Sequence, residues 1–184
     1  MTYYKKLYRE AWKLKGNPRE LLLYSILRLK LPKAYELQLS GFGAGSSKMM
    51  YGSDGHEPDI TVYFNQQLLC GIEVSGTFKP YEEIRKDGIW ILPDKLRQAG
   101  SWGFRYVYCF ILEAEFPCGR WLLWQTGSQL EKLCEKAKPI EWRRWYQGRP
   151  IPERYLSTPA KLWNRGIETL LTYIKALSER EVEL

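Results

Sequence analysis

The sequence predicts an α/β fold: a central mixed β-sheet of about five strands flanked by helices, followed by a C-terminal helical extension. Segments in which apolar and polar residues alternate are interspersed with segments of helical period. Apolar residues make up 45% of the 184 residues and aromatic residues 15%, which excludes a disordered chain. The length suits one domain with a single sizeable core.

Two helices are predicted before the first strand. Residues 4–14 form a short amphipathic helix. A second helix is predicted over residues 17–30, because Asn17 suits the N-cap, Pro18 the first helical position and Glu20 the third.

The remaining elements follow in chain order. Strands are predicted at residues 35–39, 59–64, 68–75, 105–112 and 119–125, and helices at 93–100, 128–136 and 158–181. A flexible loop is predicted at 40–47 and a polar loop or short helix at 76–88, and residues 139–156 show no periodicity. We divide the chain into a core, residues 1–138, and an extension, residues 139–184, whose basic and aromatic segment and long helix pack on the core or form a dimer seam.

Two acidic residues meet in the predicted hairpin. If residues 65–67 form its loop, Phe64 lies opposite Leu68, and counting outward places Asp59 opposite Glu73 on the polar face. Like charges directly opposite each other are destabilising. A chain that keeps two carboxylates together usually places a cation between them.

The sequence Pro58-Asp59, the hairpin and Glu73-x-Ser75 together resemble the PD-(D/E)xK nuclease superfamily, which includes restriction endonucleases and archaeal Holliday junction resolvases. The order of predicted elements matches the superfamily core over about residues 18–136. The resemblance implies a DNA endonuclease, with branched or junction DNA as one substrate. It also implies Mg²⁺ or Mn²⁺ held by Asp59, Glu73 and the backbone carbonyl of Val74. A homodimer is compatible with the resemblance as well.

Ser75 departs from this pattern, because the superfamily places a lysine there to assist the attacking water. A serine carries no positive charge, so another lysine must supply it: Lys79, Lys95 or Lys48. Each of these is also readable as an ordinary surface residue. If none reaches the site, the chain is a nuclease fold with a decayed site that serves as a nucleic-acid-binding module.

Glu20 also has two interpretations. Acids of the first core helix assist the metal site in relatives of this superfamily, and Glu20 is the candidate for that role. A capping box at the start of the helix explains the same residue equally well.

The net charge of +7 favours a polyanionic partner, and we expect DNA. Arg143 and Arg144, within a cluster of tryptophan and tyrosine, are expected to contact phosphates, together with Lys48. The alternative is that this cluster packs an extension on the core. A structural or partner-binding protein, in which the positive charge is incidental, is the third functional class.

No segment has the run of about 20 apolar residues that a membrane span needs, and the N-terminus does not read as a signal peptide, so we expect a cytoplasmic protein with no membrane partner. Cys70 and Cys109 lie in predicted strands and are expected in the core, whereas the pairing of Cys118 and Cys134 stays open.

Overall fold

We describe the protein from a computed structural model, which places residues 17–39, 58–146 and 149–182. The predicted helix over residues 4–14, the loop at 40–47 and Lys48 lie outside the described residues.

The central sheet is mixed, as predicted, but it has six strands where about five were expected. Its strand order is β1-β2-β3-β5-β6-β9. The strands span Tyr35–Leu39 (β1), Ile60–Phe64 (β2), Gln67–Thr77 (β3), Tyr106–Leu112 (β5), Leu122–Thr126 (β6) and Asn164–Arg165 (β9). Only β3 and β5 pair in parallel, and the other neighbours are antiparallel. The additional strand, β9, has two residues, too few to produce an alternating pattern.

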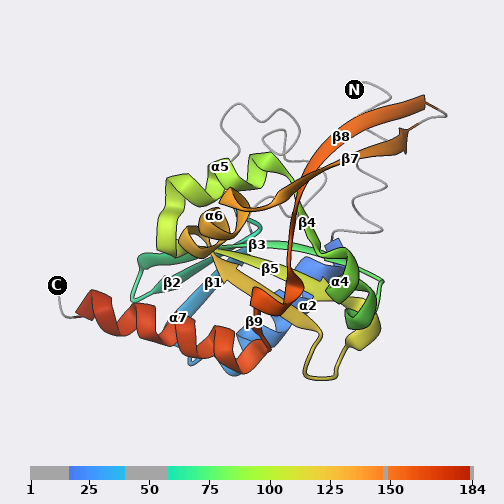
Figure 1. The fold of residues 1–184 in the computed structure, drawn as a ribbon. Helices are drawn as coiled ribbons and strands as arrows, with labels where there is room; N and C mark the ends of the chain where they lie inside the picture. The colour runs from blue at the N-terminus through green and yellow to red at the C-terminus, as the bar shows by residue number, and fades with distance from the viewer. Residues whose placement is uncertain (1–16, 40–57, 147–148, 183–184) are drawn as a thin grey trace, which may run out of the picture.

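Helices cover both faces of this sheet (Figure 1). They span Asn17–Lys30 (α2), Tyr81–Asp87 (α4), Pro93–Trp102 (α5), Gly127–Glu135 (α6) and Ile167–Val182 (α7). Leucines of α2 and α7 pack in one buried cluster, and residues of α4, α5 and α6 pack in the other. This confirms the predicted α/β layout of a sheet between helices.

Strand β5 lies at the centre of the molecule and divides the two clusters. All seven of its residues are buried. Val107, Cys109 and Ile111 face the cluster of α2 and α7, whereas Tyr106 and Tyr108 face the cluster of α4, α5 and α6. The polar hydroxyl groups of β5 therefore all lie on the α5 side of the sheet.

A second, three-stranded sheet corrects the prediction that residues 139–156 are irregular. Its order is β4-β8-β7, with β4 at Ile89–Ile91, β7 at Lys138–Tyr146 and β8 at Arg149–Thr158. Strands β7 and β8 form a long arm that extends away from the body (Figure 1). Pro150 and Pro152 made this segment read as irregular, but they lie beyond the residues that β4 pairs, where one side of β8 is open.

The C-terminal helix begins later than predicted. Residues 160–162 form a 3-10 turn, β9 follows, and α7 begins only at Ile167. Leu162, expected on the apolar face of the helix, is 52% exposed. The α6 cap is also corrected from Ser128 to Thr126, whose hydroxyl accepts from the Gln129 backbone N–H in a capping box.

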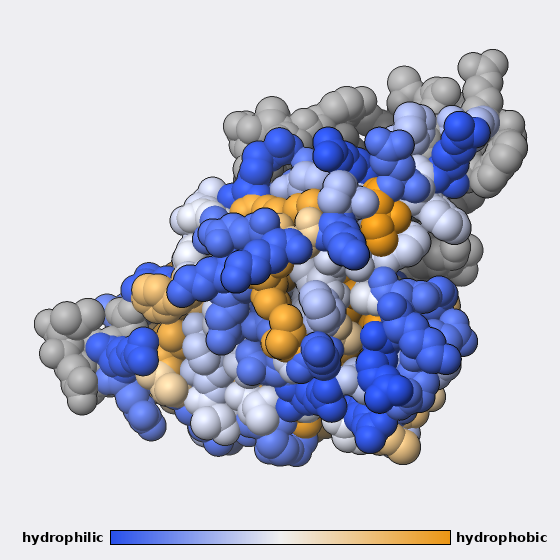
Figure 2. All heavy atoms as spheres, viewed as in Figure 1, coloured by the Kyte–Doolittle hydropathy of each residue, from blue (hydrophilic) through white to orange (hydrophobic). Residues whose placement is uncertain are grey.

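Hydrophilic side chains cover most of the face seen in Figure 2, and apolar ones gather in small areas near its middle. Within the described residues no helix is long and apolar enough to cross a membrane. Cys70 and Cys109 are buried in the core as expected, and all four cysteines are free.

Candidate active site

The hairpin of β2 and β3 brings the two predicted acids to one place by a different route from the one expected. The loop has two residues, not three: Asn65 and Gln66 both have positive φ, and Phe64 pairs with Gln67. A β-bulge beside Val62 then inserts one residue and restores the predicted pairing, so that Ile60 lies opposite Ile72. Continued by one residue, this register sets Asp59 against Glu73.

Asp59 lies just before β2, where β3 continues past the end of β2 and is paired on its other edge with β5. Its Oδ2 accepts a hydrogen bond from the backbone N–H of Val74 at 2.7 Å. The N–H and C=O groups of a strand residue point to the same edge, so the carbonyl of Val74 also faces this open edge. The predicted third oxygen ligand therefore lies on the side of β3 where Asp59 is.

Glu73 is paired with a lysine from another element. Nζ of Lys95, in the first turn of α5, donates to Oε1 of Glu73. The carboxylate is almost fully buried, whereas the lysine side chain keeps 29% of its surface exposed. The ion pair therefore joins a buried carboxylate to a lysine side chain that is partly exposed to solvent.

Glu20 points inward from the first turn of α2. It is 2% exposed, compared with 8% for Asp59 and 4% for Glu73. Among the described side chains, Oε2 of Glu20 is a buried oxygen without a hydrogen-bond partner. A glutamate that served only the helix cap would not need this burial, which costs free energy when no partner is present.

All three carboxyl groups have a raised pKa, and burial is the largest cause in each case. Burial, and then the charge of Glu73, raise the pKa of Glu20 to about 7. The pKa of Asp59 is raised well above its usual value by burial, by Glu73 and by Glu20. Burial also raises the pKa of Glu73, against the opposing effect of Lys95. Burial alone would lower the pKa of Lys95, but the carboxylates outweigh it and the pKa is raised. The site thus holds three acids and one firmly protonated lysine.

Gly71 makes room for the segment that carries Asp59. A Cβ at this position would lie 2.3 Å from Cγ of Pro58 and 2.9 Å from the Trp102 ring. Such distances are not tolerated, so only glycine lets Pro58 and α5 pack against β3 here. The packing sets the position of Asp59, the residue after Pro58.

Ser75 contacts a tyrosine of the neighbouring strand. Its side chain is hydrogen bonded to Tyr108 of β5. The pKa of Tyr108 is raised to about 12, chiefly by burial, while the Ser75 hydrogen bond acts in the opposite direction.

Sequence reasoning missed the tyrosines on this side of β5. Tyr106 donates to Oε1 of the buried Gln98 of α5 at 3.1 Å. The charges of Glu73 and Asp59 both act on Tyr106 and Tyr108. Their alternation in β5 is the signal that could have placed both tyrosines on one face of the sheet.

The other predicted basic residues lie elsewhere. Lys79 is exposed, and its Nζ donates to Oδ2 of Asp87 at 2.7 Å rather than to an acid of the site. Arg143 and Arg144 lie on the β7–β8 arm, where the Arg143 side chain is exposed. Of the two proposed lysines that the structure describes, Lys95 and Lys79, only Lys95 contacts Glu73, and Lys48 lies outside the described residues.

The oxygen donors suit a hard divalent cation in type, and the unpartnered Oε2 of Glu20 suits a missing positive partner. Within residues 17–39, 58–146 and 149–182, however, no three acidic, histidine or cysteine side chains are grouped so that they could hold a metal. Asp59 and Glu73 would then be the protein's carboxylate ligands. Mg²⁺ is usually bound in this way, through one or two carboxylates with waters and substrate oxygens.

No protein-family model matches the chain, and neither the curated proteins nor the solved structures contain a match.

Proposed function

We propose that the protein is a cytoplasmic, metal-dependent DNA endonuclease. One observation carries the proposal: the buried carboxylates of Asp59 and Glu73 meet at one end of a hairpin, with the ammonium group of Lys95 against Glu73. Sites with several mutually perturbed titratable groups are typical of catalysis. A purely structural pair would not need a third buried acid, Glu20.

The reaction is hydrolysis of a phosphodiester. The oxygen of water forms a bond to phosphorus, the bond from phosphorus to one sugar oxygen breaks, and the products are a phosphate monoester and a hydroxyl group. Mg²⁺ or Mn²⁺ bound to Asp59 and Glu73 would activate the water and neutralise charge on the phosphate.

The chain's own groups have separate roles in this scheme. Lys95 supplies the positive charge that Ser75 lacks, next to the developing charge on the phosphate oxygens. Glu20, with a pKa of about 7, accepts the proton of the attacking water at neutral pH. Ser75 and Tyr108 hold β3 and β5 together behind the acids.

DNA is the proposed partner because the chain carries a net charge of +7 and the exposed Arg143 lies on an extended arm. We propose branched or junction DNA as the substrate. A homodimer would allow two strands to be cut.

The test is cleavage of a supercoiled plasmid and of a four-way junction with Mg²⁺ and with Mn²⁺. We expect the wild type to cut, and Glu73→Gln, Asp59→Asn and Lys95→Met each to lower the rate by at least about 100-fold, since each removes charge from the transition state. Lys30→Met is the matched control: it removes an exposed lysine that pairs with Glu168, away from the site, so its rate should stay close to that of the wild type.

Two outcomes would contradict the proposal. If Glu73→Gln cuts as fast as the wild type, cleavage comes from a contaminant or from another site. If Lys95→Met cuts as fast as the wild type, Lys95 does not supply the charge and its assignment is wrong.

A binding module with a decayed site is the second candidate. It is favoured by the scarcity of ligands, since the described residues contain no group of three acidic, histidine or cysteine side chains that could hold a metal, and Lys95 already neutralises Glu73. A wild type that binds DNA in a salt-dependent manner, but never cuts it with either metal, would establish this candidate.

A further inference from the structure

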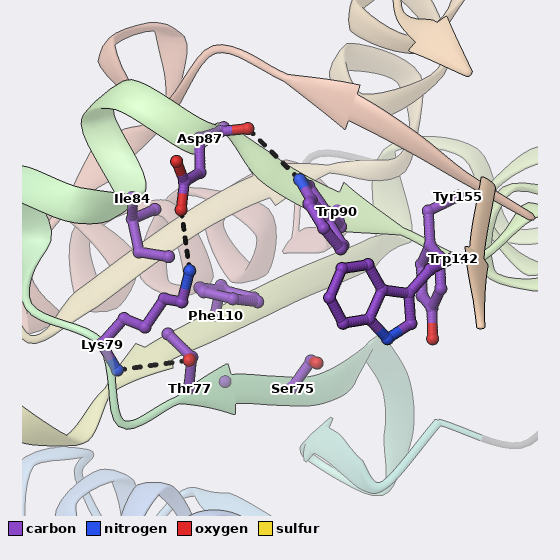
Figure 3. Close-up of a pocket in the computed structure, with 11 residues that line it drawn as sticks. Ser75, Thr77, Lys79, Ile84, Asp87, Trp90, Phe110, Trp142 and Tyr155 are labelled. Atoms are coloured by element: carbon purple, nitrogen blue, oxygen red, sulfur yellow. Dashed lines mark hydrogen bonds and ion pairs between the residues drawn. The ribbon is translucent and has the colours of Figure 1, made fainter. Parts of the chain in front are cut away.

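A cavity of about 290 Å³ lies beside the acid cluster, between the last residues of β3 and the second sheet (Figure 3). Ser75 is one of its lining residues, and it stands two positions after Glu73 on the same side of β3. Two strand residues span about 6.6 Å, so the cavity begins roughly one side chain away from the acids.

One wall of the cavity is aromatic. Trp90 of β4, Trp142 of β7 and Tyr155 of β8 project from the same face of the second sheet. The ring of Trp90 lies 5.5 Å from that of Trp142 and 5.9 Å from that of Tyr155, measured between centroids (Figure 3). Trp142 nevertheless keeps 52% of its surface exposed. A large ring is thus held by neighbours with much of its surface free for contact.

The opposite side of the cavity is polar. Nζ of Lys79 donates to Oδ2 of Asp87 at 2.7 Å, and the backbone N–H of Lys79 donates to Oγ1 of Thr77 at 3.2 Å. Figure 3 shows this group facing the three aromatic side chains across the cavity. Stacking surfaces on one side, with hydrogen-bond donors and acceptors on the other, suit a flat heteroaromatic ring with polar edges.

The volume of the cavity limits the size of the ligand that it can hold. Sites for drug-sized molecules run from about 300 to 1,000 Å³, and this one lies at the lower limit. It fits a single ring system better than a whole dinucleotide cofactor.

We propose that this cavity takes one unstacked nucleobase of a DNA strand whose adjacent phosphate lies at Asp59 and Glu73. The base stacks on Trp142, with the tilted ring of Trp90 beside it, and its polar edge meets Thr77, Lys79 and Asp87. The inference rests on the proposed function and specifies it: the substrate has an unpaired base next to the scissile phosphate, as DNA does at branches, gaps and single-stranded overhangs.

The test measures binding by fluorescence anisotropy in EDTA, where a metal-dependent enzyme does not cut. The probes are a labelled single-stranded oligonucleotide and the same sequence as a blunt duplex. Trp142→Ala and Trp142→Leu should bind the single strand about tenfold more weakly than the wild type, because stacking on one base is lost. Trp142→Phe should retain most of the affinity, and duplex binding should be unchanged in all three variants.

Phe104→Ala is the matched control, since Phe104 is an aromatic residue 49% exposed that does not line the cavity. Equal single-strand affinity of Trp142→Leu and the wild type would overturn the inference. So would an equal loss in Trp142→Leu and Phe104→Ala.

The result also separates this inference from the nuclease proposal. If the wild type never cuts DNA but Trp142→Leu selectively loses single-strand affinity, the base site stands and the nuclease falls. If the wild type cuts and Trp142→Leu binds single strands normally, the nuclease stands and the base site falls.

Discussion

At the residue scale, the site brings three acidic side chains into the protein interior, where folded proteins rarely place charged groups. Asp59, Glu73 and Glu20 are all buried, and Lys95 is the cation that contacts Glu73. Removing one partner of a buried ion pair typically costs about 3–5 kcal/mol. Because the protonation of these buried groups changes with pH, the free energy of unfolding also depends on pH.

Glu20 gives a prediction for the metal-free protein. Its pKa rises from 4.5 to about 7 on folding, so the folded state holds its proton more tightly than the unfolded state does. The contribution to stability is complete below about pH 4.5 and is lost as pH rises through about 7. At 1.36 kcal/mol for each unit of pKa, the loss is about 3 kcal/mol.

Urea unfolding in EDTA, followed by circular dichroism at about pH 5 and about pH 8, measures this change. The free energy of unfolding of Glu20→Gln should fall less over this range than that of the wild type, by about 3 kcal/mol. Glu36→Gln, which alters an exposed glutamate of β1, should behave as the wild type does. Identical pH dependence in wild type and Glu20→Gln would contradict the burial argument.

The sequence pattern was sufficient to single out Asp59 and Glu73, because these two acids lie in a hairpin that has a clear apolar face. The sequence could not show that Lys95, rather than Lys79, contacts Glu73, since this depends on how α5 lies over β3. The burial of Glu20 was equally hidden, because a helix cap predicts the same residue type.

At the element scale, the β2–β3 hairpin fixes the geometry of the site. Its two-residue turn places positive φ at both Asn65 and Gln66, as a type I′ turn requires. Asparagine tolerates this conformation, whereas glutamine does not favour it. The turn therefore contains one well-suited and one poorly suited residue.

Gln66→Gly should raise the free energy of unfolding by about 1 kcal/mol, because glycine adopts positive φ without strain and Asn-Gly is the preferred type I′ pair. Gln67→Gly, at the first residue of β3, should lower it by about 0.5–1 kcal/mol. Chemical denaturation measures both values. A destabilised Gln66→Gly variant would show that the Gln66 side chain makes a contact worth more than the strain.

The predicted register was correct next to the acids and wrong at the loop. A three-residue loop without a bulge and a two-residue loop with a bulge give the same pairing from Val62 onward. No local pattern distinguishes them, because a bulge depends on twist and on neighbouring strands. The second sheet escaped prediction for a related reason: β7 and β8 contain prolines that are acceptable only because one side of each strand there is unpaired.

At the scale of the whole molecule, charge and shape act together. The net charge of +7 is accompanied by an arm that extends from the body and carries exposed Arg143 (Figure 1). Two-stranded β-ribbons fit the grooves of DNA. Positive charge on such an arm would bind the phosphates of a duplex.

Arg143→Ala should weaken duplex binding and reduce the slope of log affinity against log salt concentration by about 1, because one phosphate contact is lost. Anisotropy titrations at several salt concentrations measure the slope. Arg180→Ala, an exposed arginine on α7, should leave the slope unchanged. An unchanged slope in Arg143→Ala would assign that arginine to the arm's own structure.

The parallel pairing of β3 with β5 also sets the order of events during synthesis. Strands β1, β2 and β3 are sequential and pair locally, so the hairpin with both acids is complete once Thr77 has left the ribosome. Lys95 and β5 emerge later, and a parallel strand can pair only after its crossover connection has formed. Until then the two carboxylates stay in water, where their repulsion is weak. Lys95, the partner of Glu73, therefore leaves the ribosome before β5 can pair with β3.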